Sequence, residues 1–111
     1  MRKTAILAGT GFEGREAIIR SHCRDGMTIT LVRDPYNPHD PNAVAVYIDV
    51  PRVGGLLGSS RRQIGFIKAS TAKSLAKAMD SGRRISGYVK SFWAPDDYEF
   101  PRVTVEITDE I

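Results

Sequence analysis

Side chains that carry chemistry are scarce in this chain of 111 residues, which has one cysteine, Cys23, and two histidines, His22 and His39. A single cysteine excludes an internal disulfide and fits a reducing compartment, so we expect a cytoplasmic protein. Adjacent residues on a helix point in different directions, so His22 and Cys23 form a poor nucleophile pair, and Cys23 is better explained as a buried structural residue. Together with Asp40, these residues lack the spacing of a zinc site. We therefore expect no enzyme, and neither a metal nor another cofactor.

Long apolar runs are also missing from the sequence. No segment approaches the length of a membrane span. The apolar part of the N-terminus, Ala5 to Ala8, is too short for a signal peptide and is better explained as part of a first strand. The length allows one domain with a modest core but not two, so we treat residues 1–111 as a single domain, and we expect a monomer with no membrane partner.

The charge of the chain is unevenly distributed. Residues 1–91 carry 15 Lys or Arg against 7 Asp or Glu, whereas residues 92–111 carry 1 against 6. A basic body favours a polyanionic partner such as a nucleic acid. The acidic tail weakens this argument, because it would neutralise part of the field if it folded back.

Alternating apolar and polar residues predict a mainly β protein. Ser70-Thr71 can cap one principal helix over about 70–80, and residues 15–22 favour a short helical turn. The glycine-containing stretch 50–62 is expected to be a flexible loop. Six short strands with one clear helix suit a small barrel, with the helix plugging one end. The expected strands are 3–10, 27–32, 43–48, 63–67, 83–93 and 101–108.

The most informative segment lies between two of these strands, at residues 33–42. Its prolines, Pro35, Pro38 and Pro41, are spaced three apart, with Tyr36, Asn37, His39, Asp40 and Asn42 between them. Proline fixes φ, and Asn and Asp close turns by binding nearby backbone amides. The segment therefore predicts a stiff, ordered loop. Such a loop is either a well-made hairpin turn or a place for a binding site.

The order of residues in this loop resembles the signature of the HIRAN domain. The resemblance is carried by Arg33-Asp34-Pro35 and by Asn37-Pro38-His39-Asp40-Pro41-Asn42-Ala43, and it extends to Gly9–Gly14 upstream and Gln63–Ile67 downstream. It covers about residues 5–108, and it implies an OB-like or SH3-like barrel with a helical insertion. The position usually held by tyrosine in the central motif is His39.

The resemblance also implies a function. HIRAN domains of helicase-like transcription factors recognise the 3′-hydroxyl of single-stranded DNA and are often attached to helicase-like ATPases or nucleases. By position, their binding residues fall on Phe12 with Gly11 or Arg15, on His39-Asp40, and on Tyr98 or Phe100. A carboxylate can accept a hydrogen bond from a free hydroxyl but repels a phosphate, so Asp40 would read the chemistry of the end. We therefore expect a non-catalytic module for DNA ends, acting in repair or replication with a helicase or nuclease.

The composition of the loops agrees with this function. Single-strand binders combine a positive groove with aromatic faces on which bases stack. Phe66 and Phe92 are expected to pack in the core instead. The predicted DNA-binding residues are Phe12, Arg15, Arg33, Tyr36, His39, Asp40, Arg61, Arg62, Tyr98 and Phe100.

Two other functions remain open at this point. The barrel could be a protein-interaction module that has lost DNA binding. The spacing Gly9-x-Gly11-x-x-Gly14 also matches a dinucleotide fingerprint, which with His39-Asp40 would suit a nucleotide-binding or hydrolytic protein. The chain is too short for the doubly wound sheet that this fingerprint normally serves.

Overall fold

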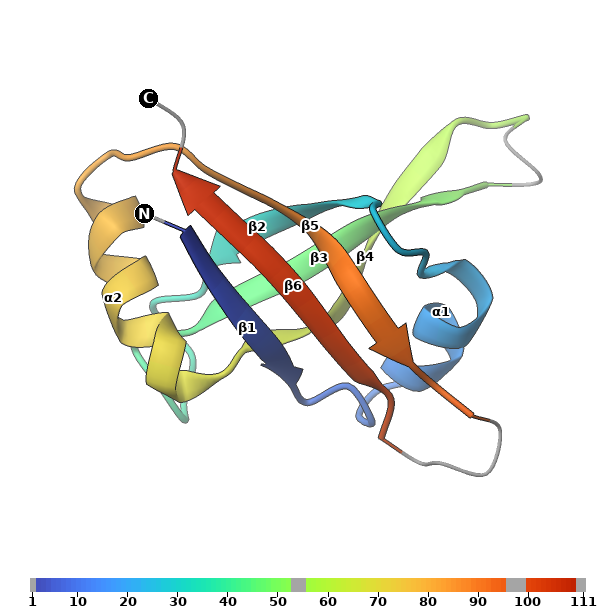
Figure 1. Cartoon of the computed structure of the whole chain (residues 1–111), viewed down its shortest axis with the longest axis horizontal. Helices are drawn as coiled ribbons and strands as arrows, with labels where there is room; N and C mark the ends of the chain where they lie inside the picture. The colour runs from blue at the N-terminus through green and yellow to red at the C-terminus, as the bar shows by residue number, and fades with distance from the viewer. Residues whose placement is uncertain (1, 53–55, 96–99, 110–111) are drawn as a thin grey trace.

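The computed structural model describes residues 2–52, 56–95 and 100–109, and these form a closed antiparallel barrel (Figure 1). The strands follow one another around the barrel in the order β1-β4-β3-β2-β5-β6. Their bounds are Arg2–Ala8 for β1, Thr28–Arg33 for β2, Val44–Pro51 for β3, Ser59–Ile67 for β4, Ile85–Trp93 for β5 and Arg102–Asp109 for β6. The helices are α1, Arg15–His22, and α2, Ala69–Asp80.

This architecture confirms the predicted barrel with one principal helix and a short helical segment at 15–22. Every strand pairing within the described residues is antiparallel. The fold is therefore not the doubly wound parallel sheet that the dinucleotide interpretation requires. In the same part of the chain, no helix has the length and apolar character needed to cross a membrane.

The core follows from the alternation in the strands and from one stripe of α2. Val103, Val105 and Ile107 of β6 all point inward and are fully buried. On α2, Ala72, Leu75 and Ala76 are buried at positions i, i+3 and i+4, which places them on one face of the helix. This face packs into the same hydrophobic core as the strands, so α2 closes one end of the barrel (Figure 1).

The prediction of a flexible loop at 50–62 is wrong for residues 50–51 and 59–62, which belong to strands, and residues 53–55 lie outside the described residues. The β3 and β4 strands continue as a paired ribbon from Ile48↔Arg62 to Pro51↔Ser59, and the Arg52 amide donates to the Gly58 carbonyl at 2.8 Å. Figure 1 shows this β3–β4 ribbon projecting past α1. Gly58 adopts a φ of 75°, so the glycine signal marks a turn at the end of the ribbon. The first half of β4 was missed in the sequence analysis, because its serines and arginines do not alternate with apolar residues.

The barrel closes at a short seam between β1 and β4. Only two residue pairs join these strands, Leu7↔Ile67 and Ala8↔Phe66. Beside them, Gly65 packs so close to β1 that a Cβ atom at this position would lie 2.8 Å from the Ala8 carbonyl oxygen. A side chain there would push the two strands apart, so the seam requires glycine.

Candidate nucleic-acid interface

The loop between β2 and β3 is held by its own polar side chains. The side-chain oxygen Oδ1 of Asn37 accepts hydrogen bonds from the backbone amides of His39 and Asp40 at 2.9 and 3.2 Å. The side-chain nitrogen Nδ2 of Asn37 donates to the carboxylate of Asp34 at 3.0 Å. The Asp40 Oδ1 atom accepts from the Asn42 amide at 2.9 Å. These are the local turns that Asn and Asp favour. The loop is therefore ordered before any ligand arrives, as its prolines and asparagines predict.

Arg33 ties this loop to α2. Its guanidinium donates to the carbonyls of Ala43 and Pro41 at 2.7 and 3.0 Å, and to both carboxylate oxygens of Asp80 at 2.9 and 3.2 Å. The hydrogen bond from Arg33 lowers the pKa of Asp80. Arg33 thus positions the loop, and its predicted contact with DNA stays a prediction.

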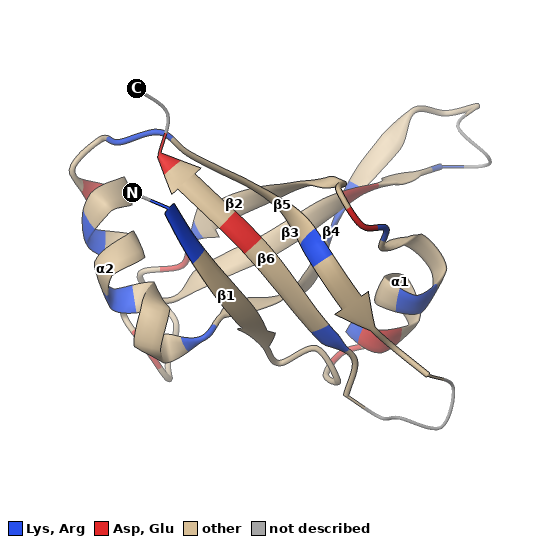
Figure 2. Cartoon of the chain, in the orientation of Figure 1, with Lys and Arg blue, Asp and Glu red and all other residues tan. Residues whose placement is uncertain are grey.

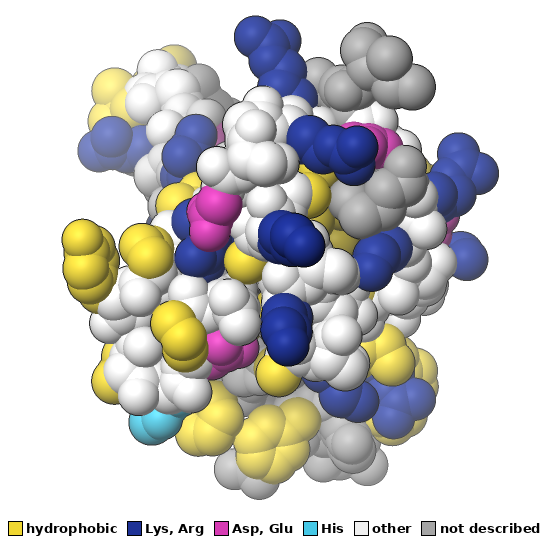
Figure 3. Space-filling view, turned by 90° about the vertical axis from the view of Figure 1, so that its left-hand side faces the viewer, with side chains coloured by type: hydrophobic (Ala, Val, Ile, Leu, Met, Phe, Trp, Pro, Cys, Tyr) yellow, Lys and Arg dark blue, Asp and Glu magenta, His cyan; other side chains and the backbone are white. Residues whose placement is uncertain are grey.

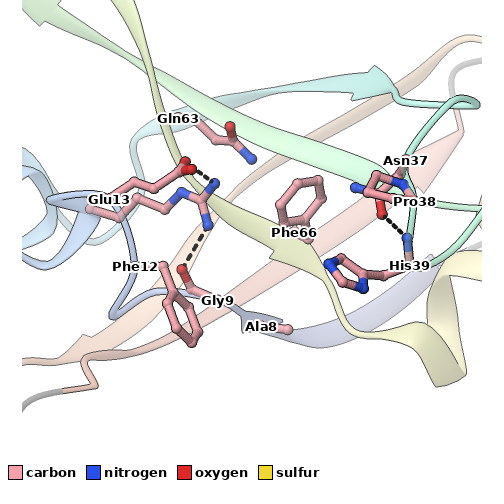
Figure 4. A pocket seen from close by; sticks show the side chains of 10 residues that line it. Ala8, Gly9, Phe12, Glu13, Asn37, Pro38, His39, Gln63 and Phe66 are labelled. Atoms are coloured by element: carbon pink, nitrogen blue, oxygen red, sulfur yellow. Dashed lines mark hydrogen bonds and ion pairs between the residues drawn. The ribbon is translucent and has the colours of Figure 1, made fainter.

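Three adjoining hollows lie beside the loop, and together they form what we call the groove. The largest has a volume of about 610 Å³, and it is lined from the β1–α1 segment, the β2–β3 loop and β4 (Figure 4). A hollow of about 200 Å³ shares His39 and Phe66 with it and is also lined by Asp40 and Ala69. A third, of about 210 Å³, shares Phe12 with the largest and reaches Phe100. The groove therefore runs from the start of α2, past His39, to Phe100.

Arg15 forms part of the wall of the largest hollow. The turn before it uses left-handed backbone at Glu13 and Gly14, with φ of 56° and 77°. Arg15 donates to the Gly9 carbonyl at 2.9 Å and to the Glu13 carboxylate at 3.0 Å, and its guanidinium lies 5.2 Å from the centre of the Phe66 ring. The side chain is 9% exposed. A cation stacked on an aromatic ring is thereby held rigidly at the edge of the cavity.

Two exposed aromatic rings stand at the other end of the groove. Phe12 and Phe100 are 61% and 48% exposed, and their ring centroids lie 6.4 Å apart at an interplanar angle of 55°. The Thr10 hydroxyl donates to the Pro101 carbonyl at 2.5 Å, which holds the two segments together. These two neighbouring rings offer faces on which nucleic-acid bases can stack.

The groove thus brings together five of the residues predicted to bind DNA: Phe12, Arg15, His39, Asp40 and Phe100. The others lie elsewhere. Tyr36 is 93% exposed and lines none of the three hollows, and Arg61 and Arg62 are exposed on β4, just before Gln63 of the groove. Tyr98 lies outside the described residues.

The sequence matches the model of the HIRAN domain over residues 6–98. The chain belongs to the HIRAN domain family. HIRAN domains are nucleic-acid-binding modules rather than catalysts. Two solved structures share the fold. The HIRAN domain of human HLTF is 23% identical, with a TM-score of 0.67 over 97% of this chain and 74% of that chain. A protein from Lactobacillus plantarum is 21% identical, with a TM-score of 0.69 over 96% of this chain and 92% of that chain. No curated protein sequence matches the chain.

Gln63 and Phe66 of this HIRAN domain are among the residues that line the groove without having been predicted to do so. Gln63 borders the largest hollow. Phe66, expected in the core, is only partly buried, and in Figure 4 its ring lies between His39 and the segment that carries Phe12. The sequence did contain a signal for this position, the neighbouring Ile67. Adjacent residues of a strand point to opposite faces, so burial of Ile67 in the core places the Phe66 side chain on the outer face of β4. The expectation for Phe92 is confirmed, since it packs against the core.

Cys23 of this HIRAN domain is a buried structural residue, as predicted. Burial, with a smaller effect from Asp25, raises the pKa of its thiol to about 11. Because the thiolate is the reactive form, we expect almost no alkylation of the native protein at neutral pH and full alkylation in denaturant. Rapid stoichiometric labelling of the native protein, measured by mass spectrometry, would contradict this prediction.

No group of three or more His, Cys, Asp or Glu residues that could hold a metal ion occurs within the described ranges.

Proposed function

We propose that this HIRAN domain is a non-catalytic module that binds single-stranded nucleic acid at a free 3′-hydroxyl end, with the terminal nucleotides in the groove. One observation carries the proposal. Residues from the β1–α1 segment, the β2–β3 loop and the segment before β6 meet around one continuous groove that combines aromatic rings, a stacked guanidinium and a carboxylate. A positive groove with aromatic platforms is the usual design of single-strand binders.

Each group has a distinct role in this proposal. Phe12 and Phe100 stack bases, and Arg15, paired with Glu13 and stacked on Phe66, holds the wall of the groove in place. Asp40 accepts a hydrogen bond from the terminal hydroxyl through Oδ2, which has no hydrogen-bond partner in the described part of the chain, whereas Oδ1 holds the Asn42 amide. A terminal phosphate at that position would be repelled by the carboxylate. His39 replaces the family's usual tyrosine and stacks on the terminal base.

The strand leaves the groove along β4 in this proposal. Arg61 lies two residues before Gln63 and points to the same face, about 7 Å further along the strand. Arg61 is exposed and would meet a phosphate on this path, whereas Arg62 points to the opposite face of the ribbon. We further propose that the module acts in the cytoplasm as a monomer, in repair or replication, alongside a helicase or nuclease.

One titration tests this function. Labelled single strands that differ only at the terminus, with a 3′-hydroxyl, a 3′-phosphate or a blocked 3′ end, are titrated at several salt concentrations. We expect the hydroxyl end to bind most tightly, and the logarithm of affinity to fall linearly with the logarithm of salt, with a slope of about −0.7 for each phosphate contacted. Equal affinity for the three ends would refute end recognition.

A protein partner is the second candidate function, because the β3–β4 ribbon carries apolar side chains into solvent. Leu56 and Leu57 are 83% and 62% exposed near its turn. Exposed aliphatic pairs are typical of protein contacts rather than of phosphate contacts. If this is the main function, oligonucleotide binding will be absent or indifferent to salt, and Leu56→Ser with Leu57→Ser will abolish capture of the partner without changing the melting temperature.

A further inference from the structure

One face of α2 is built only from lysine and serine. Four exposed residues lie at positions i, i+3, i+4 and i+7 of this helix and therefore form one stripe on its surface, which we call the α2 stripe: Ser70, Lys73, Ser74 and Lys77. The Lys3 ammonium of β1 donates to the Ser74 hydroxyl at 2.6 Å, which adds a third cation to this face. The stripe contains neither an acidic residue nor a large apolar one.

The positive charge of this face is not neutralised by the acids around it. Asp80 pairs with Arg33, Glu106 with Arg2, and Asp109 with Arg83. By contrast, Lys3, Lys73 and Lys77 form no ion pair within the residues that the structure describes. Figure 2 shows the lysines of α2 in blue and an acidic residue at one end of the helix in red, and Figure 3, which looks onto this side of the molecule, shows Lys and Arg side chains over much of the face.

The chemistry of the α2 stripe suits phosphate groups. Lysine ammonium groups act as point charges, and serine hydroxyls can donate to phosphate oxygens, whereas bases need aromatic or planar partners. From Ser70 to Lys77 the α2 stripe extends for about 10 Å, a length that matches about three phosphates of one strand at 3.4 Å each. A protein partner would need apolar anchors, which this stripe lacks.

The position of the stripe relative to the groove decides which strand it can contact. Asp40 shares its hollow with Ala69, the first residue of α2, so a 3′ end read by Asp40 lies next to the helix. The hollow that reaches Phe100 shares no lining residue with the hollow of Asp40, so the nucleotides before the end extend away from α2. The strand whose end is bound therefore cannot cover the α2 stripe.

We infer that the α2 stripe binds the phosphate backbone of a second strand, the one that continues past the 3′ end at a fork or frayed junction. The inference rests on the proposed function and names its substrate class: a 3′-hydroxyl end facing an opposing strand, rather than an isolated single strand. The contact is independent of sequence, because it is made by lysines and hydroxyls to phosphates.

The test compares two ligands and two matched variants. One ligand is a single strand with a 3′-hydroxyl, and the other is the same strand annealed so that its last few nucleotides are unpaired while the opposing strand extends beyond them. Lys73→Gln with Lys77→Gln removes two charges from the stripe while keeping good helix formers. Lys90→Gln with Arg52→Gln removes two exposed charges elsewhere and serves as the control.

We expect the unaltered protein to bind the junction roughly tenfold more tightly than the single strand at low salt, and the stripe variant to lose this advantage while keeping its affinity for the single strand. The salt slope for the junction should fall by about 1.4, which is 0.7 for each lost contact. Equal losses on both ligands, or the same loss in the control variant, would overturn the inference. An absent preference for 3′-hydroxyl ends in the unaltered protein would instead remove the proposed function, so the two failures are distinguishable.

Discussion

Asp40→Asn is expected to abolish the preference for 3′-hydroxyl ends while leaving the loop folded. Asparagine keeps an oxygen for the Asn42 amide, which Asp40 holds at 2.9 Å, so the turn survives. The hydrogen bond from the terminal hydroxyl is then accepted by a neutral amide oxygen instead of a charged carboxylate, which weakens binding of hydroxyl ends by about 1 kcal/mol. Ends with a 3′-phosphate should bind more tightly, because a repulsive carboxylate is gone.

Asp40→Ala provides the contrast for this prediction. It removes both oxygens, so it should weaken binding of hydroxyl ends by roughly 1.5–3 kcal/mol and also lower the melting temperature. Titration of both ends and thermal unfolding of the two variants separate the roles of the carboxylate. If Asp40→Asn weakens all ends equally, or Asp40→Ala acts only through stability, the carboxylate holds the loop and does not read the DNA.

Gly65→Ala should damage both stability and binding, because Gly65 is next to the seam that closes the barrel. The new methyl group would lie 2.8 Å from the Ala8 carbonyl oxygen and 3.4 Å from the Leu7 Cβ atom. Overpacking of this kind costs about 1–3 kcal/mol of folding free energy. Since Ala8 and Phe66 form both the seam and the wall of the groove, separating them changes the shape of the site.

Gly87→Ala is the matched control for this variant. Its methyl group would lie 2.8 Å from the Glu106 carbonyl oxygen, an equally close contact, but Gly87 lines none of the hollows of the groove. Urea unfolding should therefore show similar losses for both variants. Oligonucleotide titration under conditions where both remain folded should show weakened binding for Gly65→Ala alone. Equal binding by the two variants would show that the groove tolerates movement of the seam.

Short-range patterns predicted much of this fold. The alternation in β6 and the buried stripe of α2 placed these elements correctly, because the periodicity of a strand or helix is set by its own residues. The β3–β4 ribbon was missed, since Ser59 to Arg62 carry no apolar alternation and are paired only through their backbone with β3.

The candidate site was predictable in part for the same reason. His39 and Asp40 stand out because proline and asparagine organise the loop locally. Phe66 and Gln63 do not, because a residue in a strand becomes part of a groove only when other segments border it. Nothing near Arg33 in the sequence indicates that its partner is Asp80, 47 positions away.

The sequence by itself determined the β-rich class of this protein, its principal helix, its stiff loop and its basic character, since each depends on neighbouring residues or on composition. Only the tertiary structure decided that Phe12, Asp40 and Phe100 border one groove and that the α2 stripe lies beside its Asp40 end. The physical reason is ring closure: pairing of β1 with both β4 and β6 brings together segments that no local interaction connects.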